Sequence, residues 1–563
     1  MKEIALMHRV DSEYCCPLSK NTIEIRLRTA KNDVSHVYII YGGKYSFAEN
    51  KNRQEMIRRY SDGLYDYFTV ILKLEDLRLV YIFEILCGKK IYFYSEDGLN
   101  SNYDFKLNYY NAFQVAYIND ADVHYEVEWM RSARFYQIFI DRFDCGNETK
   151  DKSYINLVWG EIPNSKSFAG GDLKGIVRRL DYLIDLGINT IYLTPIFQSV
   201  SNHKYDIKDY YKIDSQFGGV EDFEELIAEA KRRNIKIVMD AVFNHVSSDC
   251  IQFQDVILKG KSSEYYDWFI INGDVIDMKN VNYECFASCN YMPKWNTSNE
   301  KVQKFLIDIA LYWILRYDID GWRLDVSDEV SHNFWRMFRK AIKREKKDCV
   351  IIGENWHNAN SYLRGDQYDS IMNYAFTKAC LDFFAFNTFT AKEFAEKLIE
   401  LLMRNTYPVN NMMLNLLDSH DTDRFITRVG GDKEKLKCAL AILYMYLGAP
   451  CIYYGTEIGL EGGYDPDCRR TMDWDKAEKN GELKTLIKTL AKLKKDEILI
   501  NGEIKIYADE ELFRLERSYK GKTLRLTVNE SKKIYPLDGN IILASSENNQ
   551  KKLGCGQFVI ERM

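Results

Sequence analysis

The sequence predicts an α/β fold: a (β/α)8 TIM barrel with an inserted subdomain after strand 3, an N-terminal β-sandwich and a small C-terminal β domain. Two observations predict the barrel. From about residue 130, short apolar runs alternate with amphipathic helical stretches, and eight such apolar runs occur. Consecutive short strands at both ends of the chain predict the two β domains. A doubly wound sheet is the alternative fold. A chain of 563 residues is too long to fold around a single hydrophobic core. We therefore expect three domains: 1–125, 126–499 and 500–563.

The first domain has the pattern of strands joined by tight turns. TIEIRLR alternates Ile23, Ile25 and Leu27 with charged residues, which is typical of a strand with one buried face and one face in water. VYIIYGGKYSF and YIFEILCGKKIYFYS place glycine between β-rich runs, as in hairpins. Short strands at this spacing favour a β-sandwich.

The middle domain supplies the barrel strands and helices. Helical stretches such as LKGIVRRLDYLIDLG and FEELIAEAKRRN separate most strands, and they end at Gly187 and Asn234. The long interval over about 243–299 predicts the inserted subdomain, because long irregular connections are usually functional. From about 500 the pattern returns to short strands. The candidate barrel strands are 135–141, 189–195, 235–242, 319–326, 349–354, 370–374, 413–421 and 449–455.

Composition narrows the class of protein. A net charge of -6 and a pI near 5.9 give no basic footprint for nucleic acid or an anionic membrane surface. We see no run of about 18 apolar residues that would span a membrane and no secretory signal at the start of the sequence. The 13 cysteines form no CxxC pair, which favours reduced thiols over disulfides or zinc. We therefore expect a cytoplasmic protein.

Polar side chains follow several of the predicted strands. In a barrel, active-site groups come from the carboxyl ends of the strands. A buried pair such as Arg323 and Asp325 could be a structural salt bridge, but five polar strand ends on one rim favour a functional site. These strand ends carry His203, Tyr205, Asp206, Asp240, Asn244, His245, Arg323, Asp325, Glu354, His420 and Asp421.

Three carboxylates on an aromatic-rich rim suggest glycoside hydrolysis, which needs a nucleophile and a proton donor. Arg323 lies two residues before Asp325, so an extended strand places both on one face, and we expect the cation to lower the pKa of Asp325 and keep it ionised. Glu354 closes the apolar run CVIIGE, where desolvation raises a carboxyl pKa and suits an acid. Asp421 beside His420 could hold sugar hydroxyls.

A metal-dependent barrel hydrolase is the competing chemistry, since His and Asp are also metal ligands. That chemistry favours paired histidines on the first strand or an H-E-x-x-H helix. The first strand is FYQIFIDRF, without histidine, and no such helix motif occurs. The sequence therefore favours glycoside hydrolysis.

Four motifs resemble the conserved regions of the α-amylase family of glycoside hydrolases (family 13). DAVFNH, GWRLDV, GEN with WH, and SHD stand in the family's order. FAGGDLKGI, SNHKYDIKDYYKID, MPKWN, DSIMNY and PCIYYGTEIGLEGGYDPDCRRTMDW extend the match over about 130–475. Together with a β domain in front, they resemble the neopullulanase, cyclomaltodextrinase and maltogenic amylase subgroup.

The resemblance implies roles for individual residues. Asp325 would be the nucleophile, Glu354 the acid/base and Asp421 the stabiliser of the transition state. Trp356, just after the acid, would be a platform for an acceptor sugar, with packing beneath its loop as the alternative. The residues implied to bind the substrate are His203, Tyr205, His245, Arg323, Trp356, His420, Asp465 and Arg469.

The resemblance also implies a substrate and a partner. We expect a retaining hydrolase of α-glucosidic bonds, mainly α-1,4, in maltooligosaccharides, cyclodextrins and pullulan, with transglycosylation. The subgroup's front domain implies a homodimer. An α-glucosidase or an α-1,6-preferring oligosaccharide hydrolase is the alternative. A non-catalytic glucan-binding protein is a further alternative, for which the loss of a catalytic carboxylate would be the sign.

Three departures from the subgroup's pattern stand out. Trp295 replaces Leu in MPKWN, so we expect the inserted subdomain to line the site differently. Ser327 and Asp328 stand where Ala and Asn are usual, which adds a negative charge on the acceptor side.

The third departure concerns calcium, which binds hard oxygen ligands. A thiol and an ammonium are poor substitutes, so we expect no required cofactor and weak or absent calcium. Cys145, Asn147 and Lys150 stand where the family has oxygen ligands, leaving Asp151, Gly170 and Asp172 as candidate metal ligands.

Overall fold

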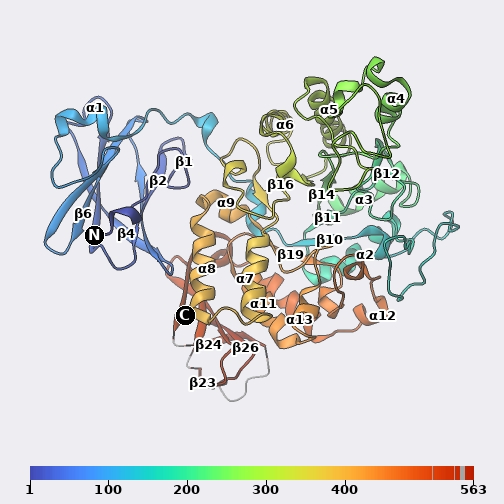
Figure 1. Cartoon of the computed structure of the whole chain (residues 1–563). Coiled ribbons are helices and arrows are strands. Elements are labelled where there is room, and N and C mark those ends of the chain that lie inside the picture. The colour runs from blue at the N-terminus through green and yellow to red at the C-terminus, as the bar shows by residue number, and fades with distance from the viewer. Residues whose placement is uncertain (510, 538, 546–551) are drawn as a thin grey trace.

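The computed structural model describes residues 1–509, 511–537, 539–545 and 552–563. The N-terminal β domain lies beside the barrel, the inserted segment lies above the barrel, and the C-terminal sheet packs below α8 (Figure 1). This arrangement confirms the predicted fold class. The N-terminal strands are β1 (Cys15–Ser19), β2 (Thr22–Ala30), β3 (His36–Gly43), β4 (Asn52–Ser61), β5 (Tyr65–Lys73), β6 (Leu79–Cys87), β7 (Lys90–Ser95), β8 (Gly98–Asn100) and β9 (Phe113–Val115).

The N-terminal strands form two layers that share one core. The strand order is β1-β2-β5-β4-β3-β6-β7-β8, with β9 paired to β6. Strand β4 passes from one layer to the other, since its first half pairs with β3 and its second half pairs with β5 across a bulge between Arg58 and Tyr60. Ile25 of β2 and Phe83 of β6 are both fully buried in the core between the layers.

The prediction that one face of TIEIRLR lies in water was wrong. Glu24 and Arg26 are 4% and 3% exposed, so both faces of β2 are buried near them. Arg26 ion-pairs with Glu24 at 2.8 Å and donates a hydrogen bond to the carbonyl of Asn405 at 2.7 Å. The sequence pattern was wrong here because the polar face of β2 packs against the barrel rather than water.

Eight parallel strands form the barrel in the order β17-β16-β15-β14-β11-β10-β19-β18. A parallel bridge between Met372 and Leu414 connects the two ends of this order and closes the ring. Each strand falls inside one of the eight predicted ranges. The strands are β10 (Phe135–Ile138), β11 (Thr190–Leu193), β14 (Lys236–Ala241), β15 (Gly321–Leu324), β16 (Val350–Gly353), β17 (Ser370–Ile371), β18 (Leu414–Leu416) and β19 (Ala449–Tyr453).

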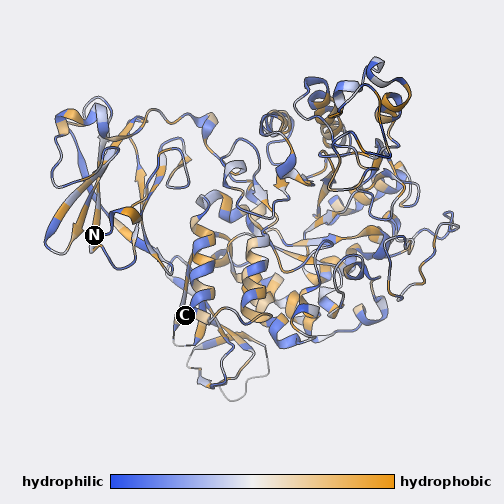
Figure 2. Ribbon diagram, viewed as in Figure 1, coloured by the Kyte–Doolittle hydropathy of each residue, from blue (hydrophilic) through white to orange (hydrophobic). Residues whose placement is uncertain are grey.

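The helices carry apolar residues on the side that meets the strands and polar residues on the other (Figure 2). Helix α2 ends at the predicted Gly187, which has a φ of 89°, and at its start the Asp172 side chain accepts from the Gly175 N–H. The helices are α1 (Asn108–Asn111), α2 (Leu173–Leu186), α3 (Val220–Arg232), α4 (Ile251–Lys259), α5 (Glu300–Tyr317), α6 (His332–Glu345), α7 (Tyr374–Phe384), α8 (Ala391–Met403), α9 (Tyr407–Met412), α10 (Phe425–Arg428), α11 (Lys433–Met445), α12 (Trp474–Ala477), α13 (Glu482–Leu493) and α14 (Glu497–Asn501).

Two insertions lie at the carboxyl ends of the strands. A hairpin of β12 (Phe197–Ser199) and β13 (Ile207–Ile213) follows β11. The longer insertion between β14 and α5 contains α4 and isolated antiparallel bridges. Trp295 is 1% exposed in this insertion, stacks on Phe269 at 4.9 Å and donates to the Tyr210 hydroxyl at 3.2 Å. Trp295 therefore belongs to the core of the insertion, and the expectation that the inserted subdomain lines the site differently stays a prediction.

The C-terminal domain is a five-stranded sheet with a two-stranded pair beside it. Phe513 packs against Phe394 of α8, with ring centroids 4.9 Å apart, which fastens the sheet to the barrel. No helix in the described ranges is both long and apolar enough to cross a membrane. The strands are β20 (Glu503–Asp509), β21 (Leu512–Tyr519), β22 (Lys522–Asn529), β23 (Tyr535–Pro536), β24 (Asn540–Ala544), β25 (Lys552–Leu553) and β26 (Gln557–Arg562).

Candidate active site at the carboxyl ends of the barrel strands

Arg323 and Asp325 lie at the end of β15, as the sequence predicts. Arg323 Nη1 lies 2.8 Å from Asp325 Oδ1, and Nη2 of the same fully buried guanidinium lies 2.9 Å from Glu354 Oε2 at the end of β16. Strand β15 can approach β16 because residue 321 is glycine: a Cβ there would meet Val350 Cγ1 at 2.4 Å. One cation therefore contacts both carboxylates.

The backbone turns sharply after Asp325. Val326 has a φ of 43°, a left-handed conformation that costs a β-branched residue roughly 1–3 kcal/mol and is found mainly at functional sites. The turn directs the Val326 N–H to Glu354 Oε2 at 3.0 Å. Local strain is thus coupled to the placement of Glu354 beside Asp325.

The pKa values correct one expectation. Burial raises the pKa of Asp325 well above its usual range, since desolvation together with the charges of Glu354, Asp240 and Asp421 outweighs Arg323. Burial also raises the pKa of Glu354, again against Arg323. The prediction that Arg323 lowers the pKa of Asp325 was wrong in its net direction. Arg323 stabilises both anions, so its presence does not by itself separate a nucleophile from an acid.

Asp240, at the end of β14, is a central member of the site that sequence reasoning left out of its site residues. Its carboxylate lies 3.0 Å from Arg323 Nη1 and accepts from the hydroxyls of Tyr192 at 2.7 Å and Tyr205 at 3.1 Å. Desolvation raises the pKa of Asp240 to about 6. The sequence signal for Asp240 was its position directly after the apolar strand residues KIVM.

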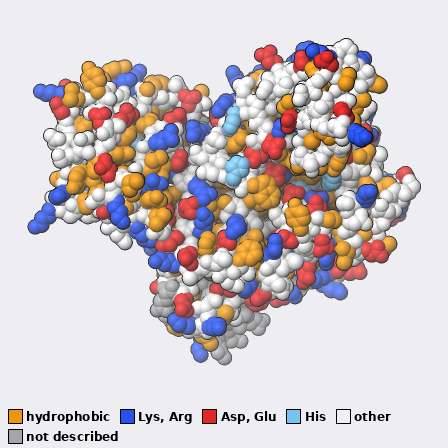
Figure 3. Space-filling model, in the orientation of Figure 1, with side chains coloured by type: hydrophobic (Ala, Val, Ile, Leu, Met, Phe, Trp, Pro, Cys, Tyr) orange, Lys and Arg blue, Asp and Glu red, His pale blue; other side chains and the backbone are white. Residues whose placement is uncertain are grey.

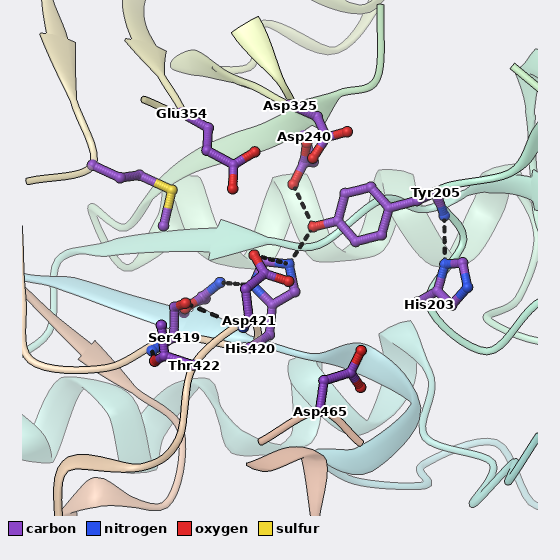
Figure 4. Close-up of polar contacts among 12 residues, drawn as sticks. His203, Tyr205, Asp240, Asp325, Glu354, Ser419, His420, Asp421, Thr422 and Asp465 are labelled. Carbon is purple, nitrogen blue, oxygen red and sulfur yellow. Dashed lines mark hydrogen bonds and ion pairs between the residues drawn. The ribbon is translucent and has the colours of Figure 1, made fainter. Parts of the chain in front are cut away.

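The β18 end supplies His420 and Asp421 (Figure 4). Asp421 lies 3.2 Å from His420 Nε2 and 3.2 Å from Arg469 Nη2. Arg469 also pairs with Asp465 at 2.9 Å, so the predicted Asp465–Arg469 pair is at the site. The Asp421 side chain is 27% exposed, so it is open on one side, unlike Asp325 and Glu354.

His203 and Tyr205 lie in the loop between β12 and β13 and face the same centre (Figure 4). The Tyr205 hydroxyl contacts His420 Nε2, and the two rings stack 5.5 Å apart at 4°. The Gln137 amide of β10 holds the other nitrogen of His420 at 2.6 Å. Burial lowers the pKa of His203 to about 4 and that of His420 well below its usual range, so both rings are neutral at pH 7.

His245 joins the site from the loop after β14. Burial lowers its pKa to about 3, and its Nε2 is among the buried atoms of the described residues that have no hydrogen-bond partner. Its ring stacks on Phe286 of the inserted segment at 4.7 Å. Lys294 joins Asn244 to Glu329, with both contacts at 2.7 Å. Lys294 lies in the MPKWN motif, although no role was predicted for it, and no sequence pattern identified Phe286.

Trp356 lies at the edge of the site. Its ring stacks on that of Tyr374, with centroids 3.7 Å apart and planes at 4°, and Trp356 remains 51% exposed. The ring therefore packs on Tyr374, as one interpretation expects, and still has exposed surface for a sugar, as the other expects. Asp328 lies 3.5 Å from His357 Nδ1, so its added charge faces a histidine beside Trp356. Ser327 is buried and donates to the Glu354 carbonyl at 2.6 Å.

Two of the three candidate metal ligands, Gly170 and Asp172, contact one lysine, whereas Asp151 has other partners. Asp151 is exposed and accepts from the Ser153 N–H at 2.8 Å. Asp172 Oδ2 lies 2.9 Å from Lys150 Nζ, and the Gly170 carbonyl accepts from the same ammonium at 2.5 Å. A cationic side chain thus lies where these oxygens converge, and the residues present do not fit calcium. No cluster of three His, Cys, Asp or Glu side chains suited to a metal occurs among the described residues.

The assembled site can perform acid/base and nucleophilic chemistry on a neutral, hydroxyl-rich ligand. It brings together all three predicted carboxylates and the predicted substrate-binding residues, and it adds Asp240 and Gln137. On the face drawn in Figure 3, basic and acidic side chains of the described residues are interspersed rather than gathered into a basic patch.

Comparisons with known proteins agree with this geometry. Residues 137–520 match the family described as "Alpha amylase, catalytic domain", and residues 1–119 match "Alpha amylase, N-terminal ig-like domain". A cyclomaltodextrinase of Thermoanaerobacter pseudethanolicus is 42% identical, covering 94% of this chain and 92% of its own. An intracellular maltogenic amylase of Bacillus subtilis is 42% identical, covering 90% and 86%.

Solved structures give the same result. A structure of a cyclomaltodextrinase superposes with a TM-score of 0.91 at 34% identity, covering 100% of this chain and 98% of that one. The matched catalytic domain contains the strand ends that assemble the carboxylates. The chain belongs to the α-amylase family and is a glycoside hydrolase of that family.

Proposed function

We propose that the protein hydrolyses α-glucosidic bonds, mainly α-1,4, in maltooligosaccharides, cyclodextrins and pullulan, with retention of anomeric configuration. The observation that carries this proposal is the Arg323 guanidinium, which lies 2.8 Å from Asp325 and 2.9 Å from Glu354 on adjacent strand ends. The relatives named cyclomaltodextrinase and maltogenic amylase support the substrate class.

The first step cleaves the glycosidic bond. Asp325 attacks the anomeric carbon while Glu354 donates its proton to the departing glycosidic oxygen, so a covalent glycosyl-enzyme forms and the leaving sugar departs as an alcohol. Burial raises the pKa of Glu354, which favours the protonated form that a general acid needs. Arg323 offsets the charge of Asp325 while the carboxylate is free.

The second step releases the sugar. Glu354, now ionised, removes a proton from water or a sugar hydroxyl, whose oxygen attacks the anomeric carbon and expels Asp325. The two nitrogens of one Arg323 guanidinium contact Asp325 at 2.8 Å and Glu354 at 2.9 Å, so the two carboxylates lie side by side. Retaining enzymes hold their two carboxyl groups closer together, at about 5–5.5 Å, than inverting enzymes, which need about 6.5–9.5 Å to admit a water. Their proximity supports the retaining course.

Asp421 and the neutral histidines hold the sugar whose bond breaks. Asp421 is open on one side and is oriented by His420 and Arg469, each at 3.2 Å. Hydrogen bonds from such a carboxylate to sugar hydroxyls strengthen as the oxocarbenium-like transition state forms. The unpartnered Nε2 of His245 offers a further contact to the substrate.

Transfer to a sugar acceptor accompanies hydrolysis. The exposed face of Trp356, fixed on Tyr374 at 3.7 Å, offers a flat apolar surface for a sugar ring beside the acid. Aromatic faces suit apolar sugar faces, since their rings combine apolar area with a polar tip or edge. A sugar bound there would compete with water for the glycosyl-enzyme.

We also propose that the protein is cytoplasmic and forms a homodimer through its N-terminal domain. The described thiols are free, and one relative is named as intracellular. The N-terminal domain exposes Ile57, Leu64 and Tyr110 at 72%, 70% and 84%. Light scattering after size-exclusion chromatography tests the dimer: a monomeric mass at micromolar concentration would contradict it.

A substrate panel tests the proposed function. The protein is incubated with β-cyclodextrin, maltotriose, pullulan and panose, and products are resolved by chromatography. We expect maltose and glucose from cyclodextrin and release from pullulan. Glucose alone from chain ends would favour an α-glucosidase, and rapid cleavage of panose with little action on maltotriose would favour the α-1,6-preferring alternative. Binding without release from any substrate would favour a non-catalytic protein and contradict the proposal.

A further inference from the structure

Lys150 is a buried cation in the loop between β10 and α2. Its side chain is 5% exposed, and an ammonium has three N–H donors and no acceptor. Three oxygens surround it: the Gly170 carbonyl at 2.5 Å, Asp172 Oδ2 at 2.9 Å and the Gln216 carbonyl at 3.1 Å. Every donor therefore has an oxygen partner, two of them from the backbone.

We propose that the Lys150 ammonium acts as a built-in cation that replaces a metal ion in this loop and positions the hairpin that carries His203 and Tyr205. The oxygens around Lys150 are the kind that a hard divalent cation binds. A divalent ion among the same oxygens would face the ammonium at a few ångströms, where like charges repel strongly in a buried setting. The chain therefore needs no calcium at this position.

Asp172 shows why a cation is required. Its carboxylate is 1% exposed and accepts from the N–H groups of Gly175 at 2.8 Å, Gly146 at 2.9 Å and Asn147 at 3.0 Å. It thereby caps α2 and fixes the start of the loop. A buried carboxylate without its counter-charge is strongly destabilising, and Lys150 is the cation that contacts it in the described part of the chain.

A second buried lysine links this loop to the active site. Gln216 accepts from Lys150 through its carbonyl and from Lys204 Nζ through its side-chain Oε1 at 2.5 Å. Lys204 is fully buried and pairs with Asp214 at 3.0 Å. Lys204 lies between His203 and Tyr205 in the chain.

These contacts connect Lys150 to the site in short steps. Gln216 takes one contact from each ammonium, so a shift of its backbone would move Lys204 as well. Tyr205 donates to Asp240 at 3.1 Å and stacks on His420, so movement of its loop would disturb the substrate-binding face. Lys150 is in this account a positioning residue, not a catalytic one.

Three variants of the full chain test the proposal. Lys150→Met removes the cation, Lys150→Asp replaces it by an oxygen ligand, and Lys152→Met removes an exposed lysine two residues away as the control. Unfolding temperature is measured in chelator and in calcium up to about 5 mM, which covers weak sites. We expect no calcium response from the wild type, a calcium-independent decrease for Lys150→Met, and a decrease for Lys150→Asp that calcium reverses saturably.

Kinetics on maltotriose test whether Lys150 positions the hairpin that carries His203 and Tyr205. This part of the proposal rests on the proposed function. We expect Lys150→Met to raise KM several-fold with a smaller change in kcat, and Lys152→Met to match the wild type. An unchanged KM would overturn the positioning role. A wild type inactive on every substrate would contradict the proposed function and leave the calcium result to decide the cation role.

The wild type alone can overturn the cation role, even if the variants at Lys150 do not fold. A wild-type unfolding temperature that rises saturably with calcium and falls in chelator would show that a metal still occupies this loop. An unfolding temperature for Lys150→Met equal to that of the wild type would show that the ammonium is dispensable. Either result contradicts the proposal.

Discussion

The Arg323 guanidinium lies 2.8 Å from the carboxylate of Asp325, and both groups are buried at the centre of the barrel's carboxyl rim. The same guanidinium contacts Glu354 at 2.9 Å and Asp240 at 3.0 Å. Three carboxylates thus share one arginine, and desolvation raises the pKa of each. The raised pKa values favour the protonated forms of these carboxyls, and general acid catalysis requires one protonated group.

Arg323→Lys should decrease kcat by about 10²–10³, the usual effect of removing one preorganised electrostatic contact. Lysine has a single charged nitrogen and cannot bridge Asp325 and Glu354 as the planar fork does. The measurement is kcat on maltotriose, with circular dichroism to verify the fold. Arg316→Lys, at a half-exposed position on α5, is the control and should retain wild-type turnover.

Glu354→Gln should lower the pKa of Asp325, because the charge of Glu354 is one of the influences that raise it. The base form of Asp325 is the nucleophile, so the acidic limb of the rate profile should move to lower pH. The measurement is the pH dependence of kcat/KM on a maltosyl fluoride, whose leaving group needs no acid. An acidic limb that stays in place or moves upward would contradict the coupling.

Trp356→Ala should decrease transfer relative to hydrolysis, since the exposed ring is the proposed surface for the acceptor sugar. Products from maltotriose with added glucose are separated by chromatography, and the ratio of transfer products to hydrolysis products is compared with the wild type. Tyr45→Ala, at an exposed aromatic position in the N-terminal domain, should leave the ratio unchanged. An equal ratio in Trp356→Ala would assign the ring to packing on Tyr374 alone.

Asp369→Asn should destabilise the protein by roughly 3–5 kcal/mol, as when one partner of a buried ion pair is removed. Asp369 is fully buried and pairs with Arg339 and Lys343, each at 2.7 Å, and His124 Nε2 lies 3.6 Å away. The variant leaves two partly buried cations, 14% and 18% exposed, without their counter-charge. Denaturant unfolding measures the loss.

The same carboxylate gives a pH dependence of stability. Arg339 and Lys343 hold the pKa of Asp369 well below its usual range, so its contribution is present above the unfolded pKa of about 3.9 and is lost as pH falls toward the folded value. Asp369→Asn should therefore weaken the wild-type loss of stability in acid. Asp366→Asn, from an exposed pair with Arg336, should change stability by less than about 1 kcal/mol.

Much of the barrel was predictable because its signals are local. Eight β-rich runs separated by helices specify the topology, and polar residues at their ends converge wherever parallel strands close into a ring. Asp325, Glu354 and Asp421 were accessible for this reason. Asp240 carried the same signal and was recognised as a strand end, but its contact with Arg323 depends on the register between β14 and β15.

Other features depended on contacts between distant segments. The burial of Glu24 and Arg26 results from packing of the N-terminal domain on the barrel, which an alternating pattern cannot show. Trp295 is a core residue because the inserted segment folds around it. Arg323 contacts both carboxylates because β15 and β16 pair closely, so the sign of the Asp325 pKa shift required the full set of neighbouring charges.

Mass spectrometry of the glycosyl-enzyme shows directly whether Asp325 is the nucleophile. Glu354→Gln is mixed with a maltosyl fluoride, which can glycosylate the nucleophile but leaves no base to help water release the sugar. We expect a mass increase of one maltosyl group on the intact protein, with the peptide that contains Asp325 carrying the label. A label on any other carboxylate, or turnover of the fluoride with inversion of configuration and no labelled protein, would contradict it.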